Sequence, residues 1–201
     1  MFKKFAETPL TLWIALAVVV ALCVIFAALV KTRRKWNARM VASGALCVAL
    51  SFVLSCIRLY RMPTGGSVTP GSMLPLMLFS VAYGAGPGLL AGLVYGVLQY
   101  LQGGWFLNVW QFLLDYLLAY GALGLAGLAK KLPKTWGLYV AIIIAAVTRA
   151  ISATLAGYMF WDTAFWASLV YNGTYLIPDT LICIVLALIV AKPVMKILQT
   201  K

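Results

Sequence analysis

Two ionisable residues, Asp115 and Arg149, lie within stretches of the chain that otherwise contain mainly apolar side chains. A charge at membrane depth costs about 3 kcal/mol or more, so it is tolerated where it faces a partner, a water-filled cavity or a ligand. An acid and a base at similar depth on two different helices therefore predict a polar pocket inside a membrane protein. An ion pair that only clamps the two helices together is the alternative interpretation.

Further polar and aromatic residues are expected near the same depth. Gln111 precedes Asp115 by one helical turn and so shares its face, and Asn172 lies a few residues into the last apolar stretch. Such a set suits a small, planar, nitrogen-rich cation, because carboxylates accept bonds from amino groups and aromatic faces attract cations. The aromatic candidates, for which an interfacial belt is the alternative, are Trp105, Tyr116, Tyr158 and Trp161.

The composition defines the class of protein. Of 201 residues, 64% are hydrophobic and 10% are charged, and the mean hydropathy is +1.00. These values predict an all-α membrane protein with several spans rather than a β-barrel, whose short alternating segments are not visible. The chain contains no His, no CxxC pair and no Walker A, HExxH or GxSxG motif. We therefore expect neither an enzyme nor a metal site or cofactor, and energy for uphill transport would come from another subunit.

The apolar runs predict seven membrane crossings, two of them short for a bilayer of about 30 Å. We divide the chain into residues 1–37, an N-terminal transmembrane helix with a basic cytoplasmic loop, and residues 38–201, a substrate-binding bundle. The first run is too long for a signal peptide, so we expect a retained helix. The predicted spans are 9–30, 38–60, 73–86, 88–102, 105–128, 135–157 and 167–191.

The net charge of +12 is concentrated at the ends of the apolar runs. This pattern indicates cytoplasmic loops, so we expect the N-terminus outside the cell membrane and the C-terminus inside, and no binding of nucleic acid. It also places the polar stretch 61–72 outside, either as a plain connector or as a lid over an outward pocket. The cations are Lys31, Arg33, Arg34, Lys35, Arg39, Lys130, Lys131, Lys134, Lys192, Lys196 and Lys201.

Two other features have alternative interpretations. Asp179 follows Pro178 in the last span, so it either caps the backbone that the proline frees or pairs with Arg149. Ala45 and Ala49 lie one helical turn apart, which lets another helix approach closely. That second helix belongs either to the same bundle or to a partner subunit.

Several stretches in order resemble one known family, the thiamine-specific substrate-binding subunits (S-components of the ThiT/YuaJ type) of energy-coupling-factor (ECF) vitamin importers. The similarity covers about residues 38–190, and the order and spacing of the stretches make it more specific than any one of them. They are 49–55 (ALSFVLS), 62–67 (MPTGGS), 98–104 (LQYLQGG), 111–116 (QFLLDY), 121–127 (GALGLAG) and 168–175 (SLVYNGTY).

The resemblance implies a six-helix S-component bundle with a thiamine pocket near the outer face and a lid formed by 61–72. The additional N-terminal helix lies outside that plan. The resemblance also implies assembly with an ECF transmembrane coupling subunit and two ATPase subunits, with the docking motif at Ala45 and Ala49. The positions that it assigns to the ligand are Trp105, Asp115, Tyr116, Arg149, Gly157, Trp161 and Asn172.

The chain differs from the family pattern at two ligand positions. Ala153 stands where the family usually has a His, and Ala167 stands where it has a Tyr. We therefore expect thiamine or a related compound, such as its pyrimidine or thiazole half. The alternative function is a self-sufficient secondary transporter or channel, against which the absence of internal repeats argues.

Overall fold

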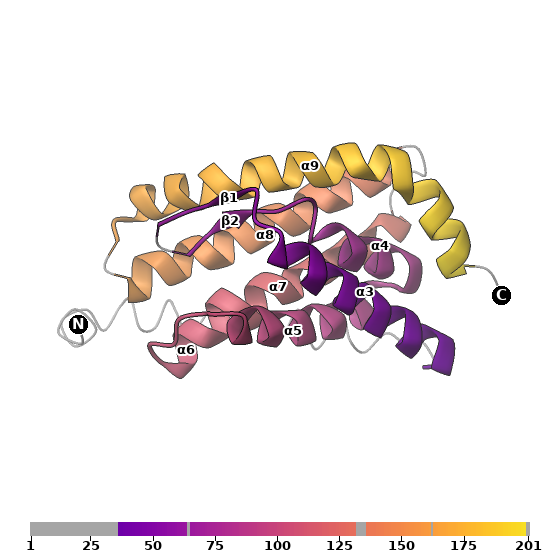
Figure 1. The fold of residues 1–201 in the computed structure, drawn as a ribbon, viewed down its shortest axis with the longest axis horizontal. Coiled ribbons are helices and arrows are strands. Elements are labelled where there is room, and N and C mark those ends of the chain that lie inside the picture. Colours follow the sequence, from indigo (N-terminus) through magenta and orange to yellow (C-terminus); the bar gives the residue numbers. More distant parts are fainter. Residues whose placement is uncertain (1–35, 64, 132–135, 162, 200–201) are drawn as a thin grey trace.

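The computed structural model describes residues 36–63, 65–131, 136–161 and 163–199, which form one bundle of helices (Figure 1). Four helical segments are long and apolar enough to cross a membrane: Ala38–Cys56, Val109–Ala129, Gly137–Phe160 and Phe165–Leu198. Two shorter apolar helices, Leu74–Tyr83 and Ala85–Leu101, complete the apolar set among these residues. The expected α-helical membrane class with several spans is confirmed. The predicted helix at 9–30 lies outside the described residues.

The helices follow the predicted spans closely, with ends shifted by several residues. Between the first two, the expected loop contains a small hairpin in which Tyr60 pairs with Val68 and Arg61 with Ser67. The elements are α3 (Ala38–Cys56), β1 (Tyr60–Arg61), β2 (Ser67–Val68), α4 (Leu74–Tyr83), α5 (Ala85–Leu101), α6 (Val109–Phe112), the π-helix η1 (Leu113–Leu118), α7 (Ala119–Gly121), the 3₁₀-helix η2 (Ala122–Lys131), α8 (Gly137–Phe160) and α9 (Phe165–Gln199).

Local sequence explains where several helices begin and bend. The Asn37 side chain accepts a bond from the Met40 N–H at 2.8 Å, and Asn108 caps α6 in the same way through the N–H of Gln111. Pro178 and Pro193 lie inside α9, where each removes one backbone hydrogen bond. The C-terminal part of α9 turns away from the rest of that helix in Figure 1.

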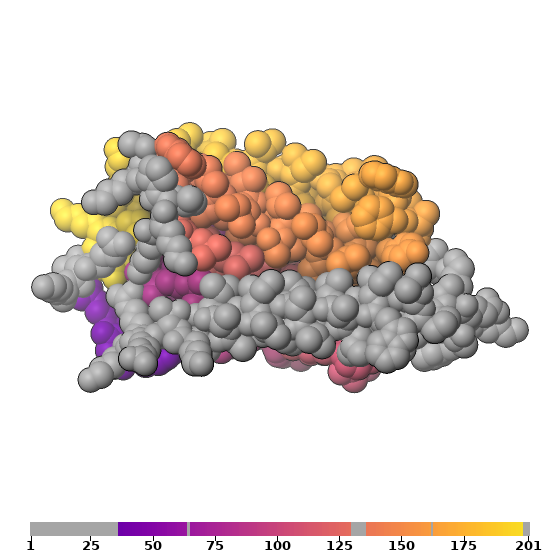
Figure 2. Space-filling model, turned by 180° about the vertical axis from the view of Figure 1, so that it is seen from behind, coloured from indigo at the N-terminus to yellow at the C-terminus, as the bar shows by residue number. Residues whose placement is uncertain are grey.

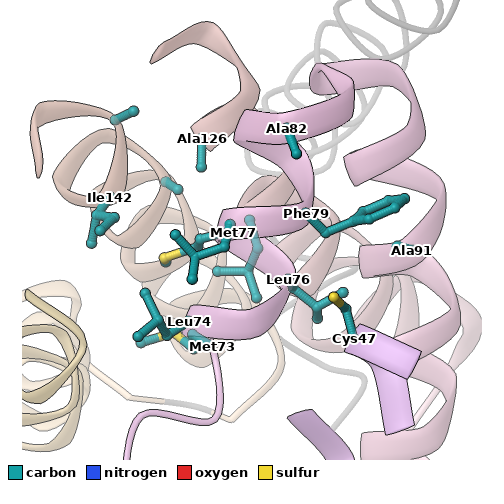
Figure 3. Close-up of a cluster of buried hydrophobic side chains, with 14 of the residues drawn as sticks. Cys47, Met73, Leu74, Leu76, Met77, Phe79, Ala82, Ala91, Ala126 and Ile142 are labelled. Atoms are coloured by element: carbon teal, nitrogen blue, oxygen red, sulfur yellow. The ribbon is translucent and has the colours of Figure 1, made fainter. Parts of the chain in front are cut away.

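The short helix α4 is the centre of the bundle. It contacts α3, α5, α8, α9 and η2, and nearly all of its residues are buried, which explains why it is apolar on every side. Figure 3 shows its side chains meeting those of the surrounding helices. The residues labelled there are Met73, Leu74, Leu76, Met77, Phe79 and Ala82 in and beside α4, with Cys47, Ala91, Ala126 and Ile142 from the neighbours.

Glycines bring α5 very close to the segment that carries Asp115. A Cβ at Gly92 would lie 2.5 Å from the Tyr120 carbonyl oxygen, and one at Gly96 would lie 2.5 Å from the Tyr116 carbonyl oxygen. Small residues permit such backbone contact between membrane helices. From the end of α7 into η2 the glycines recur at every third position, which is the period of a 3₁₀-helix, so they share one face. They are Gly121, Gly124 and Gly127.

The last two long helices, α8 and α9, pack side by side along the bundle. Seen from behind, α8 in orange and the adjoining part of α9 form the upper part of the visible face (Figure 2). Many of their outward side chains are apolar and exposed, including Val147, Ile151 and Val185. Such a surface is expected for helices that face lipid.

The close contact at Gly92 predicts a specific loss of stability. A Gly92→Ala substitution should destabilise the protein by about 1–3 kcal/mol, because backbone atoms cannot move aside easily. Gly173→Ala is the matched control, since its Cβ would meet only Ile177 Cδ1 at 3.7 Å. Thermal unfolding of both variants in detergent measures the difference, and equal midpoints would contradict this description of the interface.

Candidate functional site

A cavity of about 610 Å³ lies at one end of the bundle. Its lining includes residues from the loop after α3, from the turn after α5 and from the connection between α8 and α9. These are the three connections that the charge pattern predicts to lie outside the cell. All seven residues that the family resemblance assigns to a ligand line this one cavity: Trp105, Asp115, Tyr116, Arg149, Gly157, Trp161 and Asn172.

Asp115 is held by two hydrogen bonds to the same carboxylate oxygen. Gln111 Nε2 donates to Oδ2 at 2.7 Å, and Trp161 Nε1 donates to it at 3.3 Å. Gln111 is itself fully buried and accepts a bond from the Leu107 N–H at 3.2 Å. A buried carboxylate requires such donors. The bonds therefore fix its position at the cavity wall, and no cation among the described residues pairs with it.

The helix is wound more widely at Asp115 than elsewhere. The π-helical turn η1 spans Leu113–Leu118, and the Leu114 carbonyl accepts a bond from Ser152 Oγ at 2.7 Å. A π-turn changes the direction in which the following side chains point and is frequent at functional sites. Here it lets both Asp115 and its neighbour Tyr116 line the cavity.

Aromatic side chains form the outer part of the wall. The indoles of Trp105 and Trp161 meet edge to face, with their ring centroids 6.3 Å apart. Tyr116 accepts a bond from the Trp105 N–H at 2.8 Å, which connects this turn to η1. Trp105 remains 62% exposed, whereas Trp161 is partly covered. The aromatic faces are thus fixed in place beside the carboxylate.

Arg149 does not pair with Asp115. Its guanidinium carbon lies 4.3 Å from the centre of the Tyr120 ring, and Nη2 donates to the Tyr120 hydroxyl at 3.1 Å. Nη1 lies 2.6 Å from Met73 Sδ. Asp115 and Arg149 therefore do not form the ion pair that the alternative interpretation predicts. Each side chain is hydrogen-bonded to neutral groups instead.

The opposite wall comes from the contact between α8 and α9. Gly157 allows it, because a Cβ there would collide with Ser168 Oγ. Asn172 Nδ2 donates to the Ser168 carbonyl at 2.9 Å, and Asn172 Oδ1 accepts from the Tyr175 hydroxyl at 2.7 Å. The amide is therefore held in one orientation while its side chain lines the cavity.

The sequence suggests two partners for Asp179, the backbone that Pro178 frees and Arg149, and the structure shows a third. Within the described part of the chain, its hydrogen bonds come from Thr69 of the loop after α3, with the N–H at 3.0 Å and the hydroxyl at 2.7 Å. It forms neither a cap on its own helix nor an ion pair with Arg149. Asp179 is 2% exposed, and it lines the cavity together with Thr69.

Sequence reasoning missed several residues of the lining. Tyr95 and Gln99 come from α5, Tyr120 from α7, and Tyr171 and Tyr175 from α9. In each helix the missed residues lie four positions from another lining residue: Gln99 from Tyr95, Tyr120 from Tyr116, and Tyr175 from both Tyr171 and Asp179. That spacing places them on one helix face, so polar and aromatic residues at this period were the available signal.

The two alanines that depart from the family pattern also line the cavity. Ala153 lies between Arg149 and Gly157 on one face of α8, and Ala167 lies near the start of α9. The cavity size lies within the range of small-molecule sites.

The candidate docking residues lie on the outside of α3. Ala45 and Ala49 are both exposed, next to the exposed side chains of Leu46, Leu50 and Val53. They therefore do not serve as internal packing positions between described helices. The face they form is apolar and has small side chains at its centre.

Residues 41–199 match the family model described as "Thiamine transporter protein (Thia_YuaJ)". The chain is 32% identical over 167 residues to the thiamine transporter ThiT of Bacillus subtilis (strain 168), an alignment that covers 72% of this chain and 86% of that protein. A solved structure of ThiT from Listeria monocytogenes superposes with a TM-score of 0.69 at 23% identity, covering 79% of this chain and 96% of that one. That structural likeness shows a shared fold.

The fold and the cavity define an α-helical membrane protein with several spans and an internal cavity of the size of small-molecule sites. Together with the family match and the B. subtilis relative, they establish that the chain belongs to the thiamine transporter family (Thia_YuaJ). The relatives are named as transporters rather than as enzymes.

The separate partners of Asp115 and Arg149 predict additive effects on stability. In a double-mutant cycle with Asp115→Asn and Arg149→Gln, the coupling energy in ligand-free protein should stay below about 0.5 kcal/mol. Asp115→Asn combined with Gln111→Leu is the positive control, because those side chains share a 2.7 Å bond. Chemical unfolding in mixed micelles measures both cycles. A coupling between Asp115 and Arg149 as large as the control would restore the clamp interpretation.

Proposed function

We propose that this protein is the substrate-binding subunit of an ECF-type importer and binds thiamine or a thiamine-like compound from outside the cell. Membership of the thiamine transporter family and the name of its B. subtilis relative support this ligand class. The proposal includes no chemistry on the ligand. The chain would hold the solute while other subunits drive its uptake.

The observation that carries the proposal is the arrangement at Asp115. The Asp115 carboxylate is fixed in the cavity beside the Trp161 indole, which donates to it at 3.3 Å. Thiamine contains an aminopyrimidine, whose amino group donates hydrogen bonds, and a positively charged thiazolium ring. A carboxylate accepts the hydrogen bonds of the amino group and attracts the positive thiazolium ring. An aromatic face adds cation–π attraction to that ring.

We assign the other roles by their chemistry. Asn172, together with Asp115, hydrogen-bonds polar atoms of the ligand, and Trp161 provides the cation–π face. Trp105 and Tyr116 complete the aromatic wall. Arg149 meets the hydroxyethyl end of the ligand or a phosphate-like group there, because a guanidinium has five N–H donors and few are used here. Gly157 lets α8 and α9 pack closely in the wall beside the ligand.

The alanines at 153 and 167 bear on the exact ligand. Each stands where the family usually has a side chain that contacts thiamine, and each lines the cavity. The site thus suits thiamine held by fewer contacts, or a related compound that contains the pyrimidine or thiazole half. Competition between these three compounds for the purified protein would distinguish them.

We further propose assembly with an ECF transmembrane coupling subunit and two cytoplasmic ATPases. The chain has no Walker A loop, so ATP-driven uptake requires such partners. The exposed face around Ala45 and Ala49 is the docking surface, since small side chains let a partner helix approach. In this arrangement the C-terminus is cytoplasmic, the N-terminus is outside, and residues 1–37 contribute an extra transmembrane helix and a basic loop.

Thiamine binding provides the first test. Titration of purified protein in detergent should quench tryptophan fluorescence at micromolar thiamine or below, because the cation would stack near Trp161. Asp115→Asn should weaken binding by about 10- to 100-fold, the range expected for losing charge-assisted bonds.

Thr148→Val is the control variant for this titration, since that hydroxyl bonds only its own helix at Ile144 and is exposed. It should bind as the wild type does. Folded wild-type protein that shows no quenching would reject thiamine as the ligand. If Asp115→Asn binds thiamine as tightly as the wild type does, the ligand does not contact this carboxylate.

The docking surface has a separate test. Ala45→Leu with Ala49→Leu should leave thiamine affinity unchanged but reduce thiamine uptake at least about tenfold in cells that express the coupling subunits, because the added bulk blocks helix contact. Val147→Phe adds bulk to an exposed position on α8 and should leave uptake unchanged. Normal uptake by the double variant, or by the wild type in vesicles without coupling subunits, would contradict the docking proposal.

A further inference from the structure

The loop after α3 is seated along a single face of α9. The Gly66 N–H donates to the Tyr171 hydroxyl at 3.4 Å, and a Cβ at Gly66 would lie 2.5 Å from the Tyr175 ring. Val68 is buried in one cluster with Tyr175. Tyr171, Tyr175 and Asp179 follow each other at intervals of four residues, so they share a helix face. The loop therefore depends on α9 for its position.

The deepest contact of this loop is a small hydrogen-bonded network around Asp179. One oxygen, Oδ1, accepts from both the N–H and the hydroxyl of Thr69. The Thr69 hydroxyl has a single proton, which it gives to Asp179, so the Ser72 hydroxyl, 2.8 Å away, donates to Thr69 Oγ1. The Ser72 N–H donates to the same oxygen at 3.2 Å. All three residues are at most 4% exposed.

A neutral side chain could satisfy the Thr69 N–H at lower cost, yet the chain places a carboxylate there. Hydrogen bonds to a charged acceptor are about twice as strong as those between neutral groups. The second carboxylate oxygen has no hydrogen-bond partner among the described residues, and Asp179, Thr69 and Ser72 all line the cavity. The same network thus holds the loop and contacts the space that a ligand would occupy.

We infer that Asp179 is a positioning residue that holds the loop over the cavity through Thr69 and thereby sets how fast the ligand leaves. The ligand part of this inference rests on the proposed function. The positioning of the loop by Asp179 does not rest on the proposed function, because the Asp179–Thr69 hydrogen bonds exist in ligand-free protein. Asp179 would act through Thr69 rather than by touching the ligand itself.

Hydrogen exchange of ligand-free protein in lipid nanodiscs tests the hold directly. Asp179→Asn should speed amide exchange in peptides covering residues 66–72 at least about tenfold, while peptides from α3 and α8 stay unchanged. Thr69→Val should have a similar but smaller effect, because it keeps the backbone bond. Thr69→Ser keeps the hydroxyl, so amide exchange in residues 66–72 should be as slow as in the wild type. Thr180→Val is the control, since that neighbouring hydroxyl bonds only the Leu176 carbonyl in α9.

Stopped-flow fluorescence with thiamine tests the consequence. Asp179→Asn and Thr69→Val should each raise the dissociation rate about tenfold while changing the association rate less than threefold. The double variant should be no worse than Asp179→Asn alone, because the two residues act through one contact. Multiplying effects would mean that Asp179 contacts the ligand independently and would overturn the inference.

Two other results would also overturn the inference. Loop exchange that is the same in Asp179→Asn and wild type would show that the carboxylate does not hold the loop, whatever the ligand is. Faster exchange with unchanged thiamine dissociation would show that the bond only satisfies a buried backbone group. If the wild type fails to bind thiamine, the proposed function fails, and the exchange result still decides whether Asp179 holds the loop.

Discussion

A carboxylate within an apolar span must be hydrogen-bonded, and the site depends on how this requirement is met at Asp115. Gln111 and Trp161 provide the donors, and Arg149 bonds Tyr120 rather than this carboxylate. The carboxylate therefore lines the cavity with no ion-pair partner among the described residues. Because one donor is the Trp161 indole, the same bonds place an aromatic face next to the acid.

Close helix packing and irregular backbone in the rest of the fold position Asp115 at the cavity. Glycines in α5 let its backbone touch the segment that carries Asp115, and the π-turn at that segment turns Asp115 and Tyr116 toward the cavity. The loop after α3 then enters the bundle above the short helix α4. Irregular backbone is tolerated at such depth only when protein groups satisfy it, and Asp179 does so for the Thr69 N–H.

The sequence predicts the parts of this structure that depend on local signals. Apolar runs mark the helices, and the cost of charge in lipid identifies Asp115 and Arg149 as residues that need a special environment. The partners of those charged groups could not be predicted from the sequence, because they depend on contacts between distant segments. Nothing local shows that Arg149 would lie against Tyr120, or that Asp179 would bond Thr69 at 110 positions' separation. The π-helix η1 and the 3₁₀-helix η2 both pack against α5, and only the three-residue spacing of Gly121, Gly124 and Gly127 was visible in the sequence.

A structure of the purified protein with thiamine bound tests the central claim most directly. The account predicts the aminopyrimidine within hydrogen-bond distance of the Asp115 carboxylate, at about 2.7–3.2 Å, and the thiazolium ring against the Trp161 indole. Thiamine bound elsewhere, or a cavity in which Asp115 keeps only its bonds to Gln111 and Trp161 while the ligand lies away from it, would contradict the account.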